Sequence, residues 1–120
     1  IVNLVRNDVK EIRAVSDIVG SPTFAADFAA NLLPVIRSAP FGLYHMSNKG
    51  GCSRFELASK IVEFMGKARK IPVYPVPASE FPTAAPRPKS ELLRNRNLEL
   101  LGLDNMPTWE ESLQRYVRAL

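Results

Sequence analysis

Six prolines fall within residues 71–88, and they restrict this chain more than any other feature of its sequence. Proline has no backbone N–H, so Pro72, Pro75 and Pro77 exclude a strand in the interior of a sheet. Residues 73–76 can therefore form an edge strand at best. The rest of the segment is predicted to be an extended loop, stiffened because proline reduces the freedom of the backbone. Long rigid connections on small domains are often functional, so this loop is a candidate binding element.

The segment before the proline-rich loop predicts a strand followed by a helix. "EIRAVSD", residues 11–17, is interpreted as a short strand. Ser21 is expected to be the N-cap of the helix, and Pro22 suits the first turn, where its missing N–H leaves nothing unsatisfied. Pro34 is expected to kink or end this helix. One face carries apolar residues at helical spacing: Phe24, Phe28, Leu32, Val35 and Ile36.

A second strand and a second helix are predicted in the middle of the chain. "FGLYHMS", residues 41–47, is rich in β-prone residues and is bounded by turn residues on both sides. Ser53 and Glu56 have the spacing of a capping box, which marks the start of a helix. This helix is expected to stop at Gly66, because glycine is favoured directly after a helix end.

Two further helices are predicted in the last quarter of the chain. Residues 97–103 indicate a short helix that ends at Gly102. Thr108 and Glu111 form a second capping box. An apolar stripe follows it: Trp109, Leu113, Tyr116, Val117 and Leu120. Together the elements predict a small mixed α/β domain with short strands and about four helices.

Length and composition narrow the class of protein. A chain of 120 residues is long enough for one domain, which is predicted to span residues 1–120. The chain starts at Ile1 rather than methionine, which indicates a piece excised from a longer protein. Cys52 is the single cysteine, so no internal disulfide can form and a cytoplasmic setting is expected. No signal peptide or membrane span of about 20 apolar residues is found. The net charge of +4 comes from scattered basic residues, so no nucleic-acid partner is expected.

No complete catalytic motif is present in the sequence. Gly50 and Gly51 lack the strand–loop–helix context of a phosphate-binding loop, and no tyrosine is followed four residues later by lysine. One histidine and one cysteine cannot make a zinc site alone. His45 is interpreted as a strand histidine, although a catalytic triad containing it stays open. Cys52 is interpreted as a small structural residue, with a lowered thiol pKa at a helix entrance as the alternative.

Two stretches remain candidates for ligand binding. Asp17, Ser21 and Thr23 place polar groups at a predicted helix N-terminus, which suits an anionic or hydroxyl-rich ligand. The alternative is that Ser21 only caps the helix and Asp17 only orders the loop. Arg87 lies between two prolines, and its guanidinium could bind a phosphate or carboxylate with two hydrogen bonds. A surface salt bridge is the alternative for Arg87.

Several motifs together resemble one enzyme family. They are "VSDIVGSPTFAADFA", "GLYHMSNKGGCSRFELASKI", "PASEFPTAAPRPKSELLRNRNLELLGL" and "MPTWEESLQRYV". In order and spacing they resemble the C-terminal part of the dTDP-4-dehydrorhamnose reductase family, within the extended short-chain dehydrogenase/reductase superfamily. The resemblance covers nearly the whole chain. It implies the sugar-nucleotide-binding lobe of an NADPH-dependent reductase that converts a dTDP-4-keto sugar to dTDP-L-rhamnose for cell-surface polysaccharide.

The resemblance also implies which residues contact the substrate. Those that match the family's D-x-x-G-x-P-T and R-P motifs are Asp17, Gly20, Ser21, Pro22, Thr23, Arg87 and Pro88. Asp27 matches an acidic residue of the following helix, and Trp109 matches a family tryptophan whose place on the apolar stripe indicates core. Glu91 departs from the family, which often has serine there, so a changed substrate is implied if its side chain faces the cleft. No metal site is assigned.

The resemblance further implies partners that lie outside this chain. In the family an N-terminal Rossmann domain binds the dinucleotide and carries the catalytic Tyr-x-x-x-Lys pair, so these 120 residues are expected to be inactive alone and to hold no cofactor. The face that meets that domain would be exposed, so self-association is expected, with residues 1–10 exchanged between copies. A homodimer is also open. The alternatives are a non-catalytic regulatory module like that of methionine adenosyltransferase, another sugar-nucleotide reductase or epimerase, or a plain interaction domain.

Overall fold

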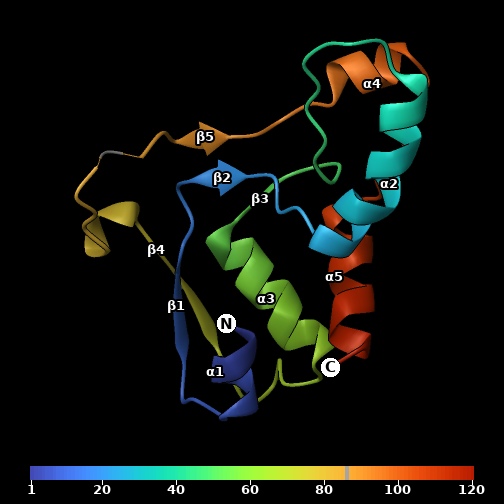
Figure 1. The fold of residues 1–120 in the computed structure, drawn as a ribbon. Coiled ribbons are helices and arrows are strands. Elements are labelled where there is room, and N and C mark those ends of the chain that lie inside the picture. The colour runs from blue at the N-terminus through green and yellow to red at the C-terminus, as the bar shows by residue number, and fades with distance from the viewer. Residues whose placement is uncertain (86) are drawn as a thin grey trace.

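Helices and short strands alternate along the chain in the computed structural model, which describes residues 1–85 and 87–120 (Figure 1). The elements are α1 (Val2–Arg6), β1 (Ile12–Val15), β2 (Val19–Gly20), α2 (Ala25–Ser38), β3 (Cys52–Ser53), α3 (Arg54–Phe64), β4 (Val73–Val76), the 3₁₀ turn η1 (Ala78–Glu80), β5 (Ser90–Glu91), α4 (Arg96–Leu100) and α5 (Trp109–Arg118). The predicted mixed α/β class is confirmed. In the ranges described, no helix is both long and apolar enough to cross a membrane.

Two small sheets organise the strands. β1 pairs in parallel with β4, with Ile12 opposite Val73 and Val15 opposite Val76. β4 has β1 as its one strand neighbour in this sheet, as the prolines predicted, because Pro75 has no N–H to donate to a second strand. The other sheet has the order β3–β2–β5, in which β2 runs antiparallel to β3 and parallel to β5.

The core lies around α3, which packs between the β1–β4 sheet and α5. Its buried apolar side chains come from α3, β1, α5 and the segments beside them. They are Val5, Ile12, Ala14, Cys52, Ala58, Ile61, Val62, Ile71, Trp109 and Leu113. Trp109 is only 5% exposed, which confirms the core position that its apolar stripe indicated.

Both predicted capping boxes are present. The Ser53 hydroxyl accepts the Glu56 N–H, and the Glu56 carboxylate accepts the Ser53 N–H at 2.7 Å, so α3 starts where the sequence indicated. Thr108 and Glu111 make the same reciprocal bonds at the start of α5. Gly66, with φ of 69°, follows the end of α3 in the left-handed conformation that glycine adopts without strain.

The start of α2 differs from the prediction. Ser21 is not the N-cap: the helix begins at Ala25, its N-cap is Phe24, and no side chain of that residue caps it. The backbone N–H of Phe24 instead donates to Oδ1 of Asn48 at 2.8 Å. A side chain from a distant segment thus takes the role that sequence reasoning gave to Ser21. The helix also continues past Pro34 to Ser38 rather than ending there.

The strand predicted at residues 41–47 is wrong. This stretch has no regular secondary structure, and two of its apolar side chains are open to solvent: Phe41 is fully exposed and Leu43 is 79% exposed. It is held by polar contacts, since Asn97 donates to the Leu43 carbonyl oxygen at 2.9 Å. A β-prone sequence needs a neighbouring strand for its hydrogen bonds, and this stretch pairs with none in the ranges described.

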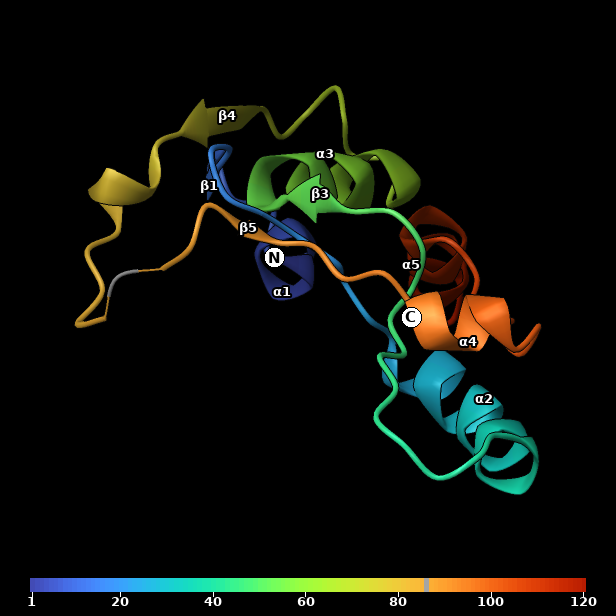
Figure 2. The same cartoon turned by 90° about the horizontal axis from the view of Figure 1, so that it is seen from above.

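The molecule is elongated rather than round. Its radius of gyration is 16.4 Å, whereas a compact chain of this length has about 14 Å. Figure 2 shows the reason: α2 and α4 lie side by side at one end, away from β1, β4 and α3. Of the fourteen residues of α2, only Asp27 and Val35 are buried, so its apolar face is largely open.

Candidate functional site

A cavity lies over the three-stranded sheet, on the segment that contains Gly20 and Ser21. β2 brings Gly20 opposite Cys52 on one side and opposite Glu91 on the other. Residues from three separate parts of the chain therefore meet around one space of about 160 Å³. Its lining residues are Ile18, Val19, Gly20, Ser21, Pro22, Cys52, Ser53, Arg54, Leu57 and Glu91.

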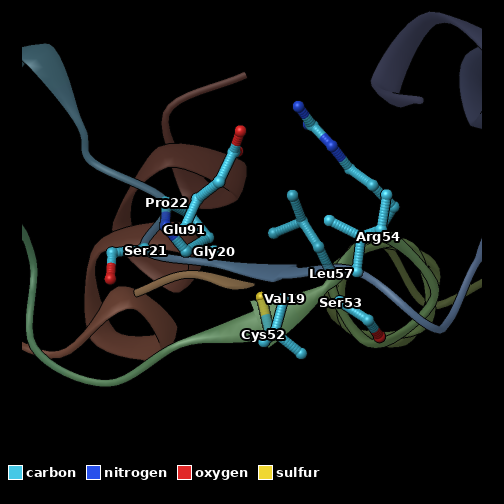
Figure 3. Close-up of a pocket in the computed structure, with 10 residues that line it drawn as sticks. Val19, Gly20, Ser21, Pro22, Cys52, Ser53, Arg54, Leu57 and Glu91 are labelled. Carbon is cyan, nitrogen blue, oxygen red and sulfur yellow. The ribbon is translucent and has the colours of Figure 1, made fainter. Parts of the chain in front are cut away.

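Two charged side chains flank the cavity. Figure 3 shows Glu91 rising on one side, Arg54 rising on the other, and Leu57 between them. Arg54 is the first residue of α3, and Glu91 is the last residue of β5. The cavity therefore has an anionic end and a cationic end, with small residues of β2 and β3 as its floor.

The close approach of the strands depends on glycine at position 51. A Cβ atom there would lie 2.9 Å from the Gly20 carbonyl oxygen and 2.0 Å from a methyl carbon of Leu92. Both separations are too short for a side chain, and the carbonyl belongs to backbone that cannot swing away. Glycine at this position lets β2, β3 and the end of β5 come together beneath the cavity.

Ser21 and Asp17 tie the cavity to the proline-rich segment. The Ser21 hydroxyl accepts the Leu93 N–H at 3.1 Å, which holds the chain just after β5. The Asp17 carboxylate accepts the Ala78 N–H at 2.8 Å, at the start of η1. The bond to Asp17 holds the start of η1, as expected if Asp17 orders the loop, while its contact with substrate stays a prediction and Ser21 lines the cavity.

The seven residues predicted to contact substrate are not all placed at this cavity. Gly20, Ser21 and Pro22 line it. Asp17 and Thr23 are exposed beside it, and the Thr23 hydroxyl donates to the Ser21 carbonyl oxygen at 3.2 Å. The remaining two, Arg87 and Pro88, are exposed and lie outside the lining. Pro86, the proline before Arg87, lies outside the described residues.

Asp27 lies outside the cavity lining and is held by polar contacts from two other segments. Asn48 donates to its carboxylate at 3.1 Å, and Arg115 forms an ion pair with it. Burial alone would raise the pKa of Asp27, but hydrogen bonds from Ser112 and Asn48, together with the Arg115 charge, hold that pKa below its ordinary value. The carboxylate therefore stays ionised and joins α2 to α5 and to the segment around Asn48.

Cys52 is a packing residue and a poor nucleophile. Burial, followed by the negative charges of Glu56 and Glu110, raises the pKa of its thiol to about 11. The thiol stays protonated at neutral pH, which excludes the reactive thiolate considered from the sequence. His45 is exposed in the irregular stretch and is not among the lining residues of the cavity. In residues 1–85 and 87–120 no cluster of three potential metal ligands occurs.

Sequence reasoning missed Arg54 and marked Glu91 only as a departure from a family pattern. Arg54 carries no local signal, because a charged residue in the first turn of a helix is ordinary on a solvated surface. Its position becomes visible only when β3 and α3 are placed beside β2. The arrangement supplies charge and hydrogen bonds for binding, while Cys52 is protonated and no histidine lies in the lining, so we assign no bond-breaking step to this cavity.

Comparisons with known proteins agree on one family. Residues 1–120 match the family model described as RmlD substrate binding domain. The spore coat polysaccharide biosynthesis protein SpsK of Bacillus subtilis is 37% identical over 109 residues, which are 91% of this chain and 37% of that protein. The crystal structure of a dTDP-4-dehydrorhamnose reductase from Clostridium acetobutylicum superposes with a TM-score of 0.89 at 36% identity, covering 98% of this chain and 41% of that one.

A dTDP-4-dehydrorhamnose reductase from Bacillus anthracis, solved in complex with NADP, superposes with a TM-score of 0.84 at 37% identity. The match again covers 98% of this chain and 41% of that one. The chain thus spans well under half the length of these relatives.

Proposed function

The chain belongs to the family of RmlD substrate-binding domains, and from this premise we propose that residues 1–120 are the sugar-nucleotide-binding lobe of an NADPH-dependent dTDP-4-dehydrorhamnose reductase. The observation that carries the proposal is the cavity over β2, β3 and β5. It is lined by Gly20, Ser21 and Pro22, three residues of the motif through which the sequence resembles this family. The reductases that superpose on nearly the whole chain support the same reading.

The substrate we propose is a dTDP-linked 4-keto-6-deoxy sugar. The cavity volume of about 160 Å³ is smaller than the roughly 300–1,000 Å³ of pockets that enclose a drug-sized molecule. It therefore suits a single ring, with the nucleotide continuing outside. The nucleotide would then contact predicted site residues that lie outside the cavity lining. They are Asp17, Thr23, Arg87 and Pro88.

Catalysis is proposed to reside in the rest of the parent protein. This chain has no glycine-rich phosphate loop and no tyrosine–lysine pair at the required spacing, so its residues do not fit a principal NADPH site. NADPH would supply the hydride for the keto carbon when bound elsewhere in the protein. We propose that this lobe holds the sugar ring and the nucleotide in place. We also propose that the parent protein works in the cytoplasm, in the biosynthesis of the sugar nucleotide.

The exposed apolar end of the molecule supports an N-terminal Rossmann domain as the principal partner. α2 and the irregular stretch that follows it line a groove of about 460 Å³. Ile36 is 67% exposed and Leu43 is 79% exposed, an unusual apolar surface for a free domain. The β-prone stretch 41–47 would gain strand hydrogen bonds at the edge of that domain's sheet, which accounts for its irregular course in this chain.

The non-catalytic alternative is less well supported. Both solved relatives described above are named dTDP-4-dehydrorhamnose reductases, and one of them was solved in complex with NADP. A regulatory module of the same fold predicts a parent protein that binds a nucleotide without turnover. Assaying the parent protein for NADPH oxidation with the dTDP-4-keto sugar separates the two, since a regulatory module would give none at any substrate concentration.

Binding by the chain itself is tested with dTDP-L-rhamnose and amide-resolved NMR. We expect shifts centred on Gly20, Ser21 and Glu91, with α3 residues outside the cavity lining, such as Lys60, unchanged. Shifts confined to other surfaces, or none at millimolar ligand, would contradict the proposed site.

Self-association through the exposed face is part of the proposal. In the structure residues 1–10 pack onto their own chain, with Val5 fully buried in the core, so exchange of that segment requires α1 to detach. Light scattering at rising concentration tests the association, and Ile36→Glu should abolish it if the apolar face is responsible. A strict monomer at high concentration would contradict both forms of association.

A further inference from the structure

Glu91 and Arg54 carry opposite charges on either side of the cavity without neutralising each other. Both side chains line it, and both are exposed. Neither takes part in an ion pair in the part of the chain that the structure describes. Each charged group is therefore open to a ligand that occupies the space between them.

The position of Glu91 is set by the backbone of the sheet. It is the register partner of Gly20 in the parallel β2–β5 pair. A Cβ at Gly20 would lie 3.9 Å from the Glu91 Cβ and 4.0 Å from its carboxylate Oε2. The side chain therefore lies beside the bare backbone of Gly20, and both residues line the cavity.

The two groups recognise different chemistry. An ionised carboxylate only accepts hydrogen bonds, so it favours hydroxyl or amino groups and repels phosphate. A guanidinium only donates, and its fork matches phosphate oxygens. A serine at position 91 would both donate and accept hydrogen bonds and would carry no charge. Glutamate at this position therefore changes what this end of the cavity accepts.

We propose that Glu91 is a specificity-determining residue: it accepts hydrogen bonds from the hydroxyl or amino groups of the sugar ring and keeps the diphosphate at the Arg54 end of the cavity. The inference rests on the proposed function, because it assumes that the cavity holds the sugar of a nucleotide sugar. It adds the orientation of the ligand, with the sugar ring toward Glu91 and the diphosphate toward Arg54. It also adds a preference for sugar rings that offer hydrogen-bond donors to Glu91.

The test compares two ligands that differ only by the ring. dTDP-L-rhamnose and dTDP are each titrated into the 120-residue chain and its variants by NMR or calorimetry. Glu91→Ala should weaken dTDP-L-rhamnose binding about tenfold and leave dTDP binding unchanged or tighter, because only the ring contact is lost and a repelling charge is removed. Glu91→Gln, which keeps an acceptor, should weaken the sugar nucleotide two- to fivefold by the same reasoning.

Two further variants complete the design. Arg54→Gln should weaken both ligands by a similar factor of about ten, since both carry the diphosphate. Glu63→Gln removes an equal charge from an exposed position of α3 outside the cavity lining and should change neither ligand. Any gain in dTDP affinity caused by Glu91→Gln should become smaller in high salt, because salt screens the repulsion between the Glu91 carboxylate and the diphosphate.

The outcomes separate the inference from the proposed function. If the unaltered chain binds neither ligand, the proposed function fails and the inference fails with it. If both ligands bind at the cavity but the Glu91 variants change both affinities by the same factor, only the inference is overturned. A loss specific to the sugar nucleotide supports it, and amide spectra that overlay outside the cavity exclude misfolding as the cause.

Discussion

Removal of the Asn48 side chain should strongly destabilise this fold, because its amide group is buried and fully hydrogen-bonded. It is completely buried and connects three segments that are distant in sequence. Its Oδ1 accepts the Phe24 N–H at 2.8 Å, and its Nδ2 donates to Asp27 at 3.1 Å and to the Ser112 hydroxyl at 2.9 Å. Replacement by alanine leaves the N–H of Phe24, the N-cap of α2, without its partner and removes one of the hydrogen bonds to the Asp27 carboxylate, which keeps its ion pair with Arg115.

The expected loss follows from the bonds that disappear. A neutral hydrogen bond contributes about 1 kcal/mol to the free energy of unfolding and one to a charged group about 2 kcal/mol, so Asn48→Ala should cost about 3–4 kcal/mol. That is a large part of the total of about 5–15 kcal/mol typical of such a domain. At an ordinary urea dependence, the unfolding midpoint should fall by about 2 M.

Urea unfolding followed by tryptophan fluorescence measures this loss directly. Trp109 is the only tryptophan and is buried in the core, so its emission reports the transition. Asn105→Ala serves as the matched control, because Asn105 is exposed and its removal should change stability by less than about 0.5 kcal/mol. A loss below about 1 kcal/mol for Asn48→Ala would refute the reasoning, since the network would then contribute no more than one ordinary hydrogen bond.

Three further predictions concern individual residues. Although burial alone would raise the pKa of Asp27, Ser112, Asn48 and Arg115 lower that pKa in the folded chain. The ionised Asp27 therefore stabilises the fold fully above its unfolded-state pKa of about 3.9, and this stabilisation is lost as the pH falls through the lower pKa of the folded state. Unfolding midpoints measured down to about pH 2 should therefore fall less steeply for Asp27→Asn than for the unaltered chain, and parallel curves would contradict this. Cys52, with its pKa raised to about 11, should react with a thiol reagent at least about a hundredfold faster in urea than in the folded chain at pH about 8, and equal rates would exclude the buried, protonated thiol. Gly51→Ala should cost about 1–3 kcal/mol because its Cβ would meet the Gly20 carbonyl oxygen at 2.9 Å, whereas Gly42→Ala, where the nearest atom lies at 3.6 Å, should be nearly neutral in the same urea assay.

The elements that the sequence predicted well are those whose signals are local. Both capping boxes place serine or threonine three residues before glutamate, and the bonds they predict form within a single helical turn. The edge position of β4 follows from proline chemistry alone, whatever the strand packs against. Such features need no knowledge of distant segments.

The errors occur where a distant partner decides the structure. Ser21 and Pro22 are suitable for a helix start, yet α2 begins at Ala25 because Asn48 offers a buried amide oxygen to the Phe24 N–H. Ser21 in turn binds the Leu93 N–H, which no local rule indicates. The stretch 41–47 has strand propensity but pairs with no strand in the ranges described, and propensity without a partner does not make a strand.

The cavity combines both kinds of information. Gly20, Ser21 and Pro22 could be selected from the sequence because they form a recognisable motif, but Arg54 joins them only through the β2–β3 register. Glu91 joins them through the β2–β5 register, in which it lies opposite Gly20. A one-residue shift of that pairing would turn the carboxylate to the other face of the sheet. The specificity proposed for Glu91 therefore depends on strand register as much as on the residue type, and a variant that slips β5 should lose the sugar preference while keeping Glu91 unchanged.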